Sequence, residues 1–180
     1  METITKLQGV YNLDGQQIVP PLFFRINYDI GNNLMVGLKF DKTDSSKVLY
    51  DLLDFNGKII MKDFPYQISF ISENKNVLVV TNKHNKSSFI NIKTKKSKSL
   101  FEYEWLSYRS QLTDGFFTAN KNGFYALFSS DGDKLTAEIY SDFKIPDAKS
   151  QIKYGNKLFC YGTRENKIYG ITKDGQEFIL

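Results

Sequence analysis

The side chains that could act as nucleophiles, bases or metal ligands are few in this chain of 180 residues. The single histidine, His84, lies in a polar, lysine-rich segment, and the single cysteine, Cys160, alternates with aromatic residues in an apolar segment. One cysteine excludes an internal disulfide framework and a multi-cysteine metal site. We interpret His84 as a solvated loop residue and Cys160 as a small buried hydrophobe. A catalytic pair formed by the two is the alternative.

Two pairs of closely spaced carboxylates could serve as a general acid and base. Asp131 and Asp133 flank a glycine, and we expect them to shape a hairpin turn. Glu102 and Glu104 would share one face of a strand, which keeps a degenerate hydrolase as a hypothesis. The sequence contains no phosphate-binding glycine loop, no HExxH motif and no Gly-x-Ser-x-Gly motif. It therefore predicts a protein that is not an enzyme, with no catalytic residue, no metal and no cofactor.

Candidate binding residues lie in two adjoining segments. Segment 74–101 carries seven lysines and no acidic residue, which we interpret first as solubility and protection of strand edges, with a patch for an acidic partner as the functional alternative. It has no arginine to interleave with aromatic residues, so nucleic acid is disfavoured. Segment 102–109 combines Trp, Tyr and Arg, the residue types of interface hot spots; the alternative for its tryptophan is a repeated aromatic position in the core. The predicted partner-binding residues are Glu104, Trp105, Tyr108, Arg109, Lys93, Lys95, Lys96 and Lys98.

The composition favours an ordered β protein. Hydrophobic residues make up 41% of the chain and aromatic residues 15%, with a formal net charge of +4. Disordered chains have few aromatic residues, and Phe and Tyr suit half-buried strands. The N-terminus lacks the apolar core of a signal peptide, and no stretch approaches the roughly 20 apolar residues that cross a bilayer. We therefore expect a cytoplasmic protein with no membrane partner.

The elements that must position the candidate residues follow a repeat. Asp-Gly and Asn-Gly dipeptides favour type I′ hairpin turns, because both residues adopt positive φ. One interval between them is about twice the others, which predicts a further turn at Lys95-Lys96 that has lost its glycine. The resulting spacing of roughly 36 to 43 residues is typical of repeated supersecondary units. The dipeptides that follow this spacing are Asp14-Gly15, Asn56-Gly57, Asp131-Gly132 and Asp174-Gly175.

Apolar and aromatic residues keep a constant phase around these turns. Each unit is predicted to contain a strand, a tight turn, a second strand, an aromatic connector and a third strand, with no convincing amphipathic helix. The fold class is therefore all-β, with repeated three-stranded antiparallel units in a single domain, residues 1–180. The units are approximately 8–40, 48–81, 87–120, 123–162 and 168–180, the last completed by residues 2–7.

Segments 9–21, 123–132 and 167–179 share a further pattern, in which an aromatic strand precedes the Asp-Gly turn. These segments resemble the tryptophan-glycine (WG) repeat family, although Tyr169-Gly170 and Tyr125-Ala126 stand where the family has Trp-Gly. The resemblance implies a largely bacterial type of protein whose repeats mediate interactions. It implies no catalytic residues.

Units that cannot bury their faces alone must stack or close radially. Completion of the last unit by residues 2–7 would remove an exposed edge, so we predict a small five-bladed propeller, with an open twisted stack of β-hairpins as the alternative. The predicted function is a non-enzymatic protein-binding module, most concretely a bacterial immunity protein or inhibitor that neutralises a toxin or enzyme by direct binding. The alternatives are a glycan-binding or small-ligand-binding repeat protein and the degenerate hydrolase.

Overall fold

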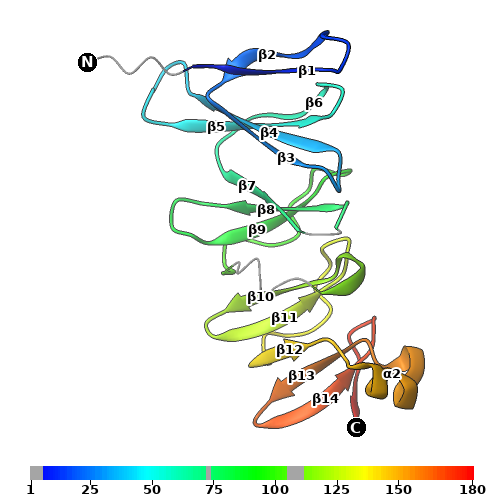
Figure 1. The fold of residues 1–180 in the computed structure, drawn as a ribbon. Helices are drawn as coiled ribbons and strands as arrows, with labels where there is room; N and C mark the ends of the chain where they lie inside the picture. The colour runs from blue at the N-terminus through cyan, green and yellow to red at the C-terminus, as the bar shows by residue number, and fades with distance from the viewer. Residues whose placement is uncertain (1–5, 72–73, 105–111) are drawn as a thin grey trace. The chain divides into compact units, whose positions relative to one another are not determined.

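The computed structural model describes residues 6–71, 74–104 and 112–180. The chain divides into two compact units, residues 1–68 (unit 1) and 69–180 (unit 2). Both consist mainly of antiparallel strands, and within each sheet the strands follow one another in sequence order (Figure 1). The predicted all-β class is confirmed.

Unit 1 contains a two-stranded hairpin followed by a four-stranded sheet. Val19 and Phe23 of the hairpin are buried together with Met35 and Leu53 of the sheet, and these side chains form the core of the unit. A hairpin alone is at best marginally stable, so the packing of its apolar face on the sheet is what holds it. The strands are β1 (Gln8–Tyr11), β2 (Gln17–Phe23), β3 (Arg25–Asp29), β4 (Leu34–Phe40), β5 (Val48–Asp54) and β6 (Ile59–Phe64).

The remaining strands form sheets of three, two and four strands, in the order β7-β8-β9, β10-β11 and β12-β13-β14-β15. Strand β7 spans the boundary between the two units in the sequence. The core of unit 2 centres on the rings of Phe89, Tyr103, Phe117 and Phe128, which contact one another mostly in tilted and edge-on arrangements. The strands are β7 (Gln67–Phe70), β8 (Val77–Thr81), β9 (Ser87–Asn91), β10 (Phe117–Lys121), β11 (Phe124–Phe128), β12 (Asp142–Lys144), β13 (Cys160–Arg164), β14 (Lys167–Ile171) and β15 (Glu177–Ile179).

Short connectors link successive sheets of unit 2. Tyr103 exchanges backbone hydrogen bonds with Ser87 at the start of β9, and the next residue, Glu104, does so with Asn120 of β10. Tyr140 likewise pairs with the start of β11 shortly before β12 begins. Each sheet therefore combines strands from two successive sequence repeats. In the last sheet, β14 and β15 are joined by β13 and β12. Residues 2–7 were expected to complete the last repeat, and of these residues 2–5 lie outside the described residues.

The turns that mark the repeat are built alike, but they are not the expected type I′ turns, because only the glycine of each dipeptide lies at positive φ. In the turns 12–16, 54–58, 129–133 and 172–176, the first residue donates its N–H to the carbonyl of the last and accepts the N–H of the glycine. The glycines lie at φ between 80° and 84°, a conformation that costs other residues more. The predicted glycine-free turn is confirmed at residues 91–96, where Lys95 lies at φ 55°. The turn 82–86 between β8 and β9 was not predicted, because Asn85 (φ 57°) takes the place of glycine there.

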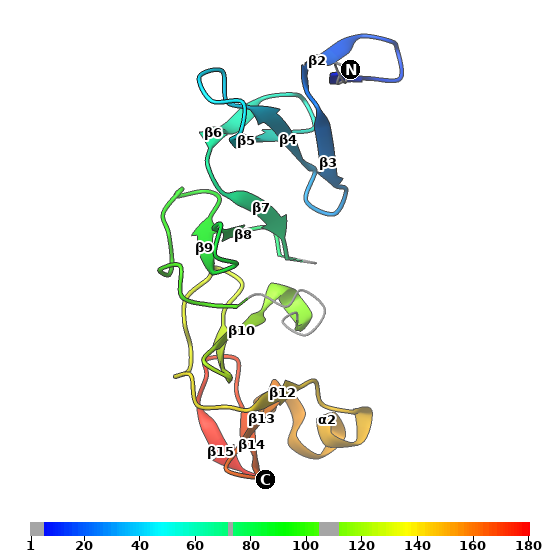
Figure 2. The same ribbon diagram turned by 90° about the vertical axis from the view of Figure 1, so that its left-hand side faces the viewer.

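One α-helix, α2 (Ala148–Tyr154), contradicts the expectation of a chain without helices. Asp147 caps it by accepting the backbone N–H of Ser150 at 2.8 Å. None of its residues is buried, so the sequence has no apolar stripe that would reveal it. The helix lies to one side of the sheet β12–β15 in both ribbon views (Figures 1 and 2). Two 3-10 turns, η1 (Thr113–Gly115) and η2 (Gly155–Lys157), complete the described elements. None of the helices in the described ranges is long and apolar enough to cross a membrane.

Candidate functional site

Residues 91–96, which we call the lysine turn, present a rigid cationic tip at the end of β9. The side chain of buried Asn91 accepts hydrogen bonds from the backbone N–H and the hydroxyl of Thr94, at 3.0 and 3.2 Å. The backbone N–H of Asn91 donates to the carbonyl of Lys96 at 3.0 Å, and its carbonyl accepts the N–H of Lys95 at 2.8 Å. These four bonds fix the backbone that carries the lysines.

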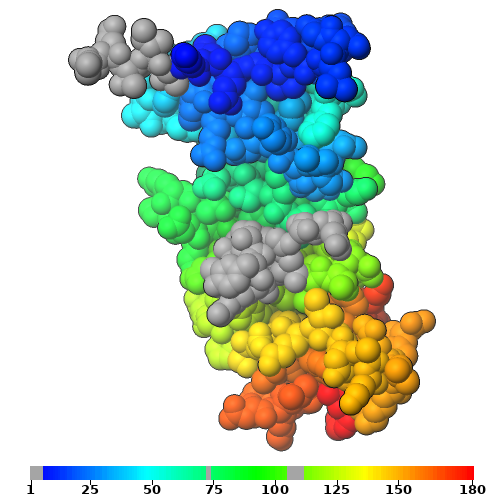
Figure 3. Space-filling view, viewed as in Figure 1, coloured from blue at the N-terminus to red at the C-terminus, as the bar shows by residue number. Residues whose placement is uncertain are grey.

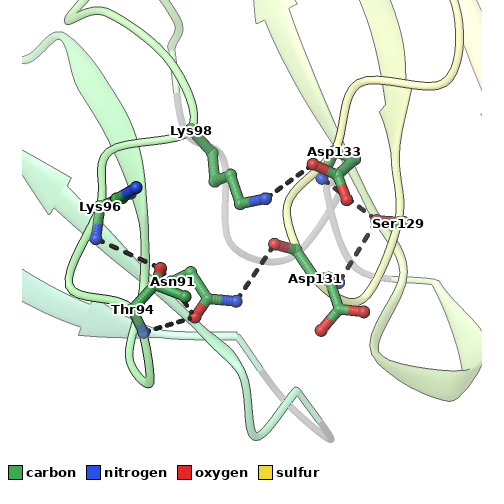
Figure 4. A network of polar contacts seen from close by, with 7 residues as sticks. All are labelled: Asn91, Thr94, Lys96, Lys98, Ser129, Asp131 and Asp133. Carbon is green, nitrogen blue, oxygen red and sulfur yellow. Dashed lines mark hydrogen bonds and ion pairs between the residues drawn. The ribbon is translucent and has the colours of Figure 1, made fainter.

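The lysine turn lies beside residues 129–133, which we call the aspartate turn (Figure 4). The Asn91 amide donates to the carbonyl of Asp131 at 3.5 Å, and Lys98 forms an ion pair with Asp133 at 2.7 Å. Within the aspartate turn, the Ser129 hydroxyl accepts the backbone N–H groups of Asp131 and Asp133. The prediction that these two aspartates shape a turn is thus refined: a serine supplies the local acceptor, and one aspartate bridges to the neighbouring turn.

The charges at this place are unevenly matched. Lys98 is neutralised by Asp133, whereas Lys93, Lys95 and Lys96 are exposed. Within the described part of the chain, none of these three ammonium groups has a carboxylate within ion-pair distance. Like charges held close together repel one another and favour an anionic partner. The lysine turn is therefore a preformed cationic site on unit 2.

The predicted partner-binding residues do not form one surface. Glu104 forms an ion pair with Lys86 at 2.8 Å, at the start of β9, while the lysine turn follows the end of that strand. Trp105, Tyr108 and Arg109 lie outside the described residues. Tyr103, two residues before Trp105 in the sequence, is buried against Phe89 and Phe128. Of the predicted set, the structure brings together the four lysines from Lys93 to Lys98.

Glu102 and Glu104 are held apart by different lysines. The Glu102 carboxylate pairs with Lys121 at 2.6 Å and the Glu104 carboxylate with Lys86 at 2.8 Å. The hydrogen bond to Glu102 raises the pKa of Lys121, which keeps that pair charged. Each carboxylate therefore faces its own lysine and not the other carboxylate.

His84 and Cys160 are also placed apart. His84 is exposed in the turn between β8 and β9, where its backbone N–H donates to Asn82. Cys160 is buried at the start of β13, among Leu127, Tyr140 and Ile171. Burial raises the pKa of the Cys160 thiol to about 12. A thiol in this state is a weak nucleophile, since the thiolate is the reactive form.

Unit 1 contains an ion cluster that the sequence analysis missed. Lys39 on β4 lies 2.5 Å from the carboxylate of Asp51 on β5 and 2.7 Å from that of Asp63 on β6. Asp51 is buried and also accepts the backbone N–H of Asp63 at 2.7 Å. Burial alone would lower the pKa of Lys39, but the hydrogen bonds to both aspartates outweigh it and raise that pKa. The residues come from three strands, so no local spacing in the sequence signals them.

A pocket of about 580 Å³ lies in unit 2 beside α2. The ring of Phe159 and the side chain of Leu158 supply apolar lining, and the amides of Gln151 and Asn156 supply polar groups. Lys173 and Asp114, also in the lining, form an ion pair at 2.6 Å. Residues 140–157, yellow to orange in Figure 3, lie on the face of unit 2 that is turned to the viewer. This pocket was not predicted from the sequence, because α2 itself was not predicted.

Comparisons with known protein families and curated proteins do not identify a family for this chain. No protein-family model matches the chain, and no curated protein matches it significantly.

Proposed function

We propose that the chain is a non-enzymatic protein-binding module that engages an acidic protein surface through the lysine turn. The observation that carries the proposal is the exposure of Lys93, Lys95 and Lys96 on a turn whose backbone is fixed by Asn91. A preorganised cationic tip loses little conformational freedom on binding, which favours affinity. It also steers an acidic partner during encounter.

The arrangement of the other candidate groups supports a binding role over catalysis. The carboxylates of Glu102 and Glu104 are each matched by a lysine. The Cys160 thiol is buried and carries a raised pKa. Neither arrangement favours the hydrolase or the Cys–His alternative.

Within this proposal, the narrower role is a bacterial immunity protein or inhibitor that acts in the cytoplasm. The resemblance to WG repeats and the cationic tip support it, since an inhibitor of this kind binds directly and needs no chemistry of its own. The five-bladed closure and the open stack of hairpins both stay predictions. Co-expression with toxin genes adjacent to the chain's own gene tests the narrower role: restored growth supports it, and growth arrest by every such toxin contradicts it.

The binding proposal is tested by charge reversal with a matched control. Both variants change the net charge equally, but one concentrates the change on the lysine turn and the other disperses it over exposed lysines elsewhere. We expect the first variant to lose at least about tenfold in affinity for proteins captured from the native cell, with a weaker salt dependence. Equal losses in both variants, measured as Kd on the purified captured protein, would contradict a role for the lysine turn. The first carries Lys93→Glu, Lys95→Glu and Lys96→Glu; the second carries Lys58→Glu, Lys83→Glu and Lys149→Glu.

A second candidate, glycan or small-ligand binding, is favoured by the pocket beside α2. An aromatic ring next to amide and charged groups is a suitable lining for a polar, sugar-like ligand. A glycan array followed by titration of Asn156→Ala tests this function. A hit that the variant binds as tightly as the wild type, or an array without hits, counts against the pocket.

A further inference from the structure

The first two turns of the repeat have the same internal structure. Asn12 and Asp54 each accept two backbone N–H groups with the side-chain oxygen, from the residues two and four positions later in the chain. Both turns close with the same pair of backbone bonds. Any difference in their surroundings is therefore a difference in packing and not in local folding.

The second turn packs on the strand that follows the first. A Cβ placed on Gly57 would lie 2.4 Å from the carbonyl oxygen of Ile18, so the turn backbone touches that strand. Phe55 of the same turn packs against the core cluster that contains Val19. The second turn is thus seated on the third and fourth residues after the glycine of the preceding turn.

The same contact recurs in unit 2. A Cβ on Gly175 would lie 2.6 Å from the carbonyl oxygen of Leu135, again the third residue after the preceding turn glycine. A Cβ on Gly132 would lie 3.1 Å from the side chain of Lys98. Packing of a turn glycine on the segment that follows the previous turn is therefore a repeated inter-repeat contact of this chain.

The first turn lacks this contact. At Gly15, no described atom lies within 4 Å of the Cβ position. Leu13, which corresponds to Phe55, is fully exposed at 107%. The first turn therefore offers an exposed apolar side chain, Leu13, and a glycine with open space beside it, Gly15. We call these two residues the N-terminal face. They correspond to the turn side of the repeated contact, without any described segment packed against it.

The last strand, β15, carries the residues that correspond to the other side of this contact. Ile179 is the fourth residue after Gly175, as Val19 is the fourth after Gly15. Val19 is 1% exposed beneath the following turn, whereas Ile179 is 89% exposed. Strand β15 is also the edge strand of its sheet. Phe178 and Ile179 thus form a C-terminal face that matches what the N-terminal face lacks.

We propose that a second copy of this chain occupies these faces, so that β15 of one copy seats the first turn of the next. The observation that selects this occupant is the match between the two faces. Within the chain, Ile18 and Val19 contact the second turn. Phe178 and Ile179 can make the same contact with the first turn, which carries Leu13. The contact joins different surfaces of the two copies, so it is head-to-tail and extends into longer assemblies or rings. It is independent of the lysine turn.

Complementation between two variants tests the proposal. Leu13→Glu removes the N-terminal face and Ile179→Lys the C-terminal face, and both side chains are exposed, so folding should be preserved. In sedimentation velocity experiments, we expect the wild-type mass to rise with concentration. Each variant alone should self-associate at least about tenfold more weakly, because a buried apolar side chain is replaced by a charge. An equimolar mixture should form dimers and no larger species, since one intact face remains on each variant.

Leu100→Lys, at another exposed apolar residue, is the matched control and should associate like the wild type. The proposal is overturned by a wild type that stays monomeric at all concentrations, or by a mixture that does not dimerise. Monomers in which Leu13→Glu and Ile179→Lys lower the melting temperature equally would instead indicate closure within one chain, and also overturn it. Loss of partner binding in the lysine-turn variant would leave all of these outcomes unchanged.

Discussion

The lysine turn and the aspartate turn occupy equivalent places in successive repeats, after β9 and β11, yet they are built differently. The aspartate turn closes between Ser129 and Asp133, and its glycine packs on Lys98 and Val77. The lysine turn closes between Asn91 and Lys96 and is one residue longer. Its residue at positive φ is Lys95, whose side chain is exposed.

This difference separates two reasons for a glycine in a turn. Positive φ alone is tolerated by Lys95, at a cost of roughly 1 kcal/mol. Close packing on neighbouring residues adds a second cost for any side chain, and it applies at Gly132, where a Cβ would lie 3.1 Å from the side chains of Lys98 and Val77. Because the lysine turn is one residue longer, its residue at positive φ, Lys95, lies outside the inter-repeat contact. The place where the repeat loses its glycine is therefore also the place where the chain can display lysines.

The largest expected effect comes from removing the buried support of the aspartate turn. Asn74 is buried, and its amide donates to the carbonyls of Gly115 and Ser130 at 2.7 and 3.0 Å, while its oxygen accepts the N–H groups of Asn76 and Val77. We expect Asn74→Leu to lower the free energy of unfolding by about 4 kcal/mol, because several buried polar groups lose their partners. Urea denaturation followed by tryptophan fluorescence and by circular dichroism measures it. A loss below about 1 kcal/mol would show that the aspartate turn holds without this support.

A smaller effect compares the two left-handed residues directly. Gly132→Ala should cost about 2 kcal/mol, since positive φ disfavours alanine and the new methyl group crowds Lys98 and Val77. Lys95→Gly, the matched control, should be neutral or stabilising by less than about 1 kcal/mol, because it relieves the φ cost and removes no packing. Melting temperatures of the two variants check the contrast. If the two melting temperatures shift by the same amount in opposite directions, the preference for positive φ alone explains the glycine, and packing contributes nothing.

The repeat phase was predictable because turn glycines and apolar strands leave a local pattern. The turn at Lys95-Lys96 followed from spacing even without its glycine, and the all-β class followed from the same pattern. Contacts between strands were not predictable in this way. The pairing of Lys39 with Asp51 and Asp63 depends on which strands become neighbours, and α2 has no buried face to leave an apolar period.

The candidate site was predictable in part for the same reason. The lysines lie close together in the sequence, within residues 93–98, and stay together at the turn, so a count of charges along the chain found them. Glu104 is close to them in the sequence, but β9 and the connector separate it from the lysine turn, and it pairs with Lys86. The support from Asn91 to the aspartate turn joins residues of two repeats, and a reading of one repeat at a time does not reveal it.

The smallest expected effect concerns a hydrogen bond between the segments that follow the lysine turn and the aspartate turn. Tyr103, which follows the lysine turn, donates its hydroxyl to Glu138, which follows the aspartate turn, at 2.5 Å. Burial alone would raise the pKa of Glu138, but the hydrogen bonds from Tyr103 and Lys134 outweigh it and lower that pKa below the ordinary 4.5. A carboxylate with a lowered pKa contributes stability that is present above its unfolded value and is lost as the pH falls through its folded value. Stability should therefore fall below about pH 4.5.

Tyr103→Phe keeps the ring in the aromatic core and removes the hydroxyl, so it isolates this hydrogen bond. We expect it to cost about 1 kcal/mol near pH 7, where the hydrogen bond reaches a charged acceptor, and to flatten the loss of stability between pH 5 and about pH 3. Melting curves over that range measure both quantities. Since the variant leaves both turns and their glycine contacts intact, a much larger loss at pH 7 would mean that Tyr103 and Glu138, and not the packing of Gly132, hold the two repeats together.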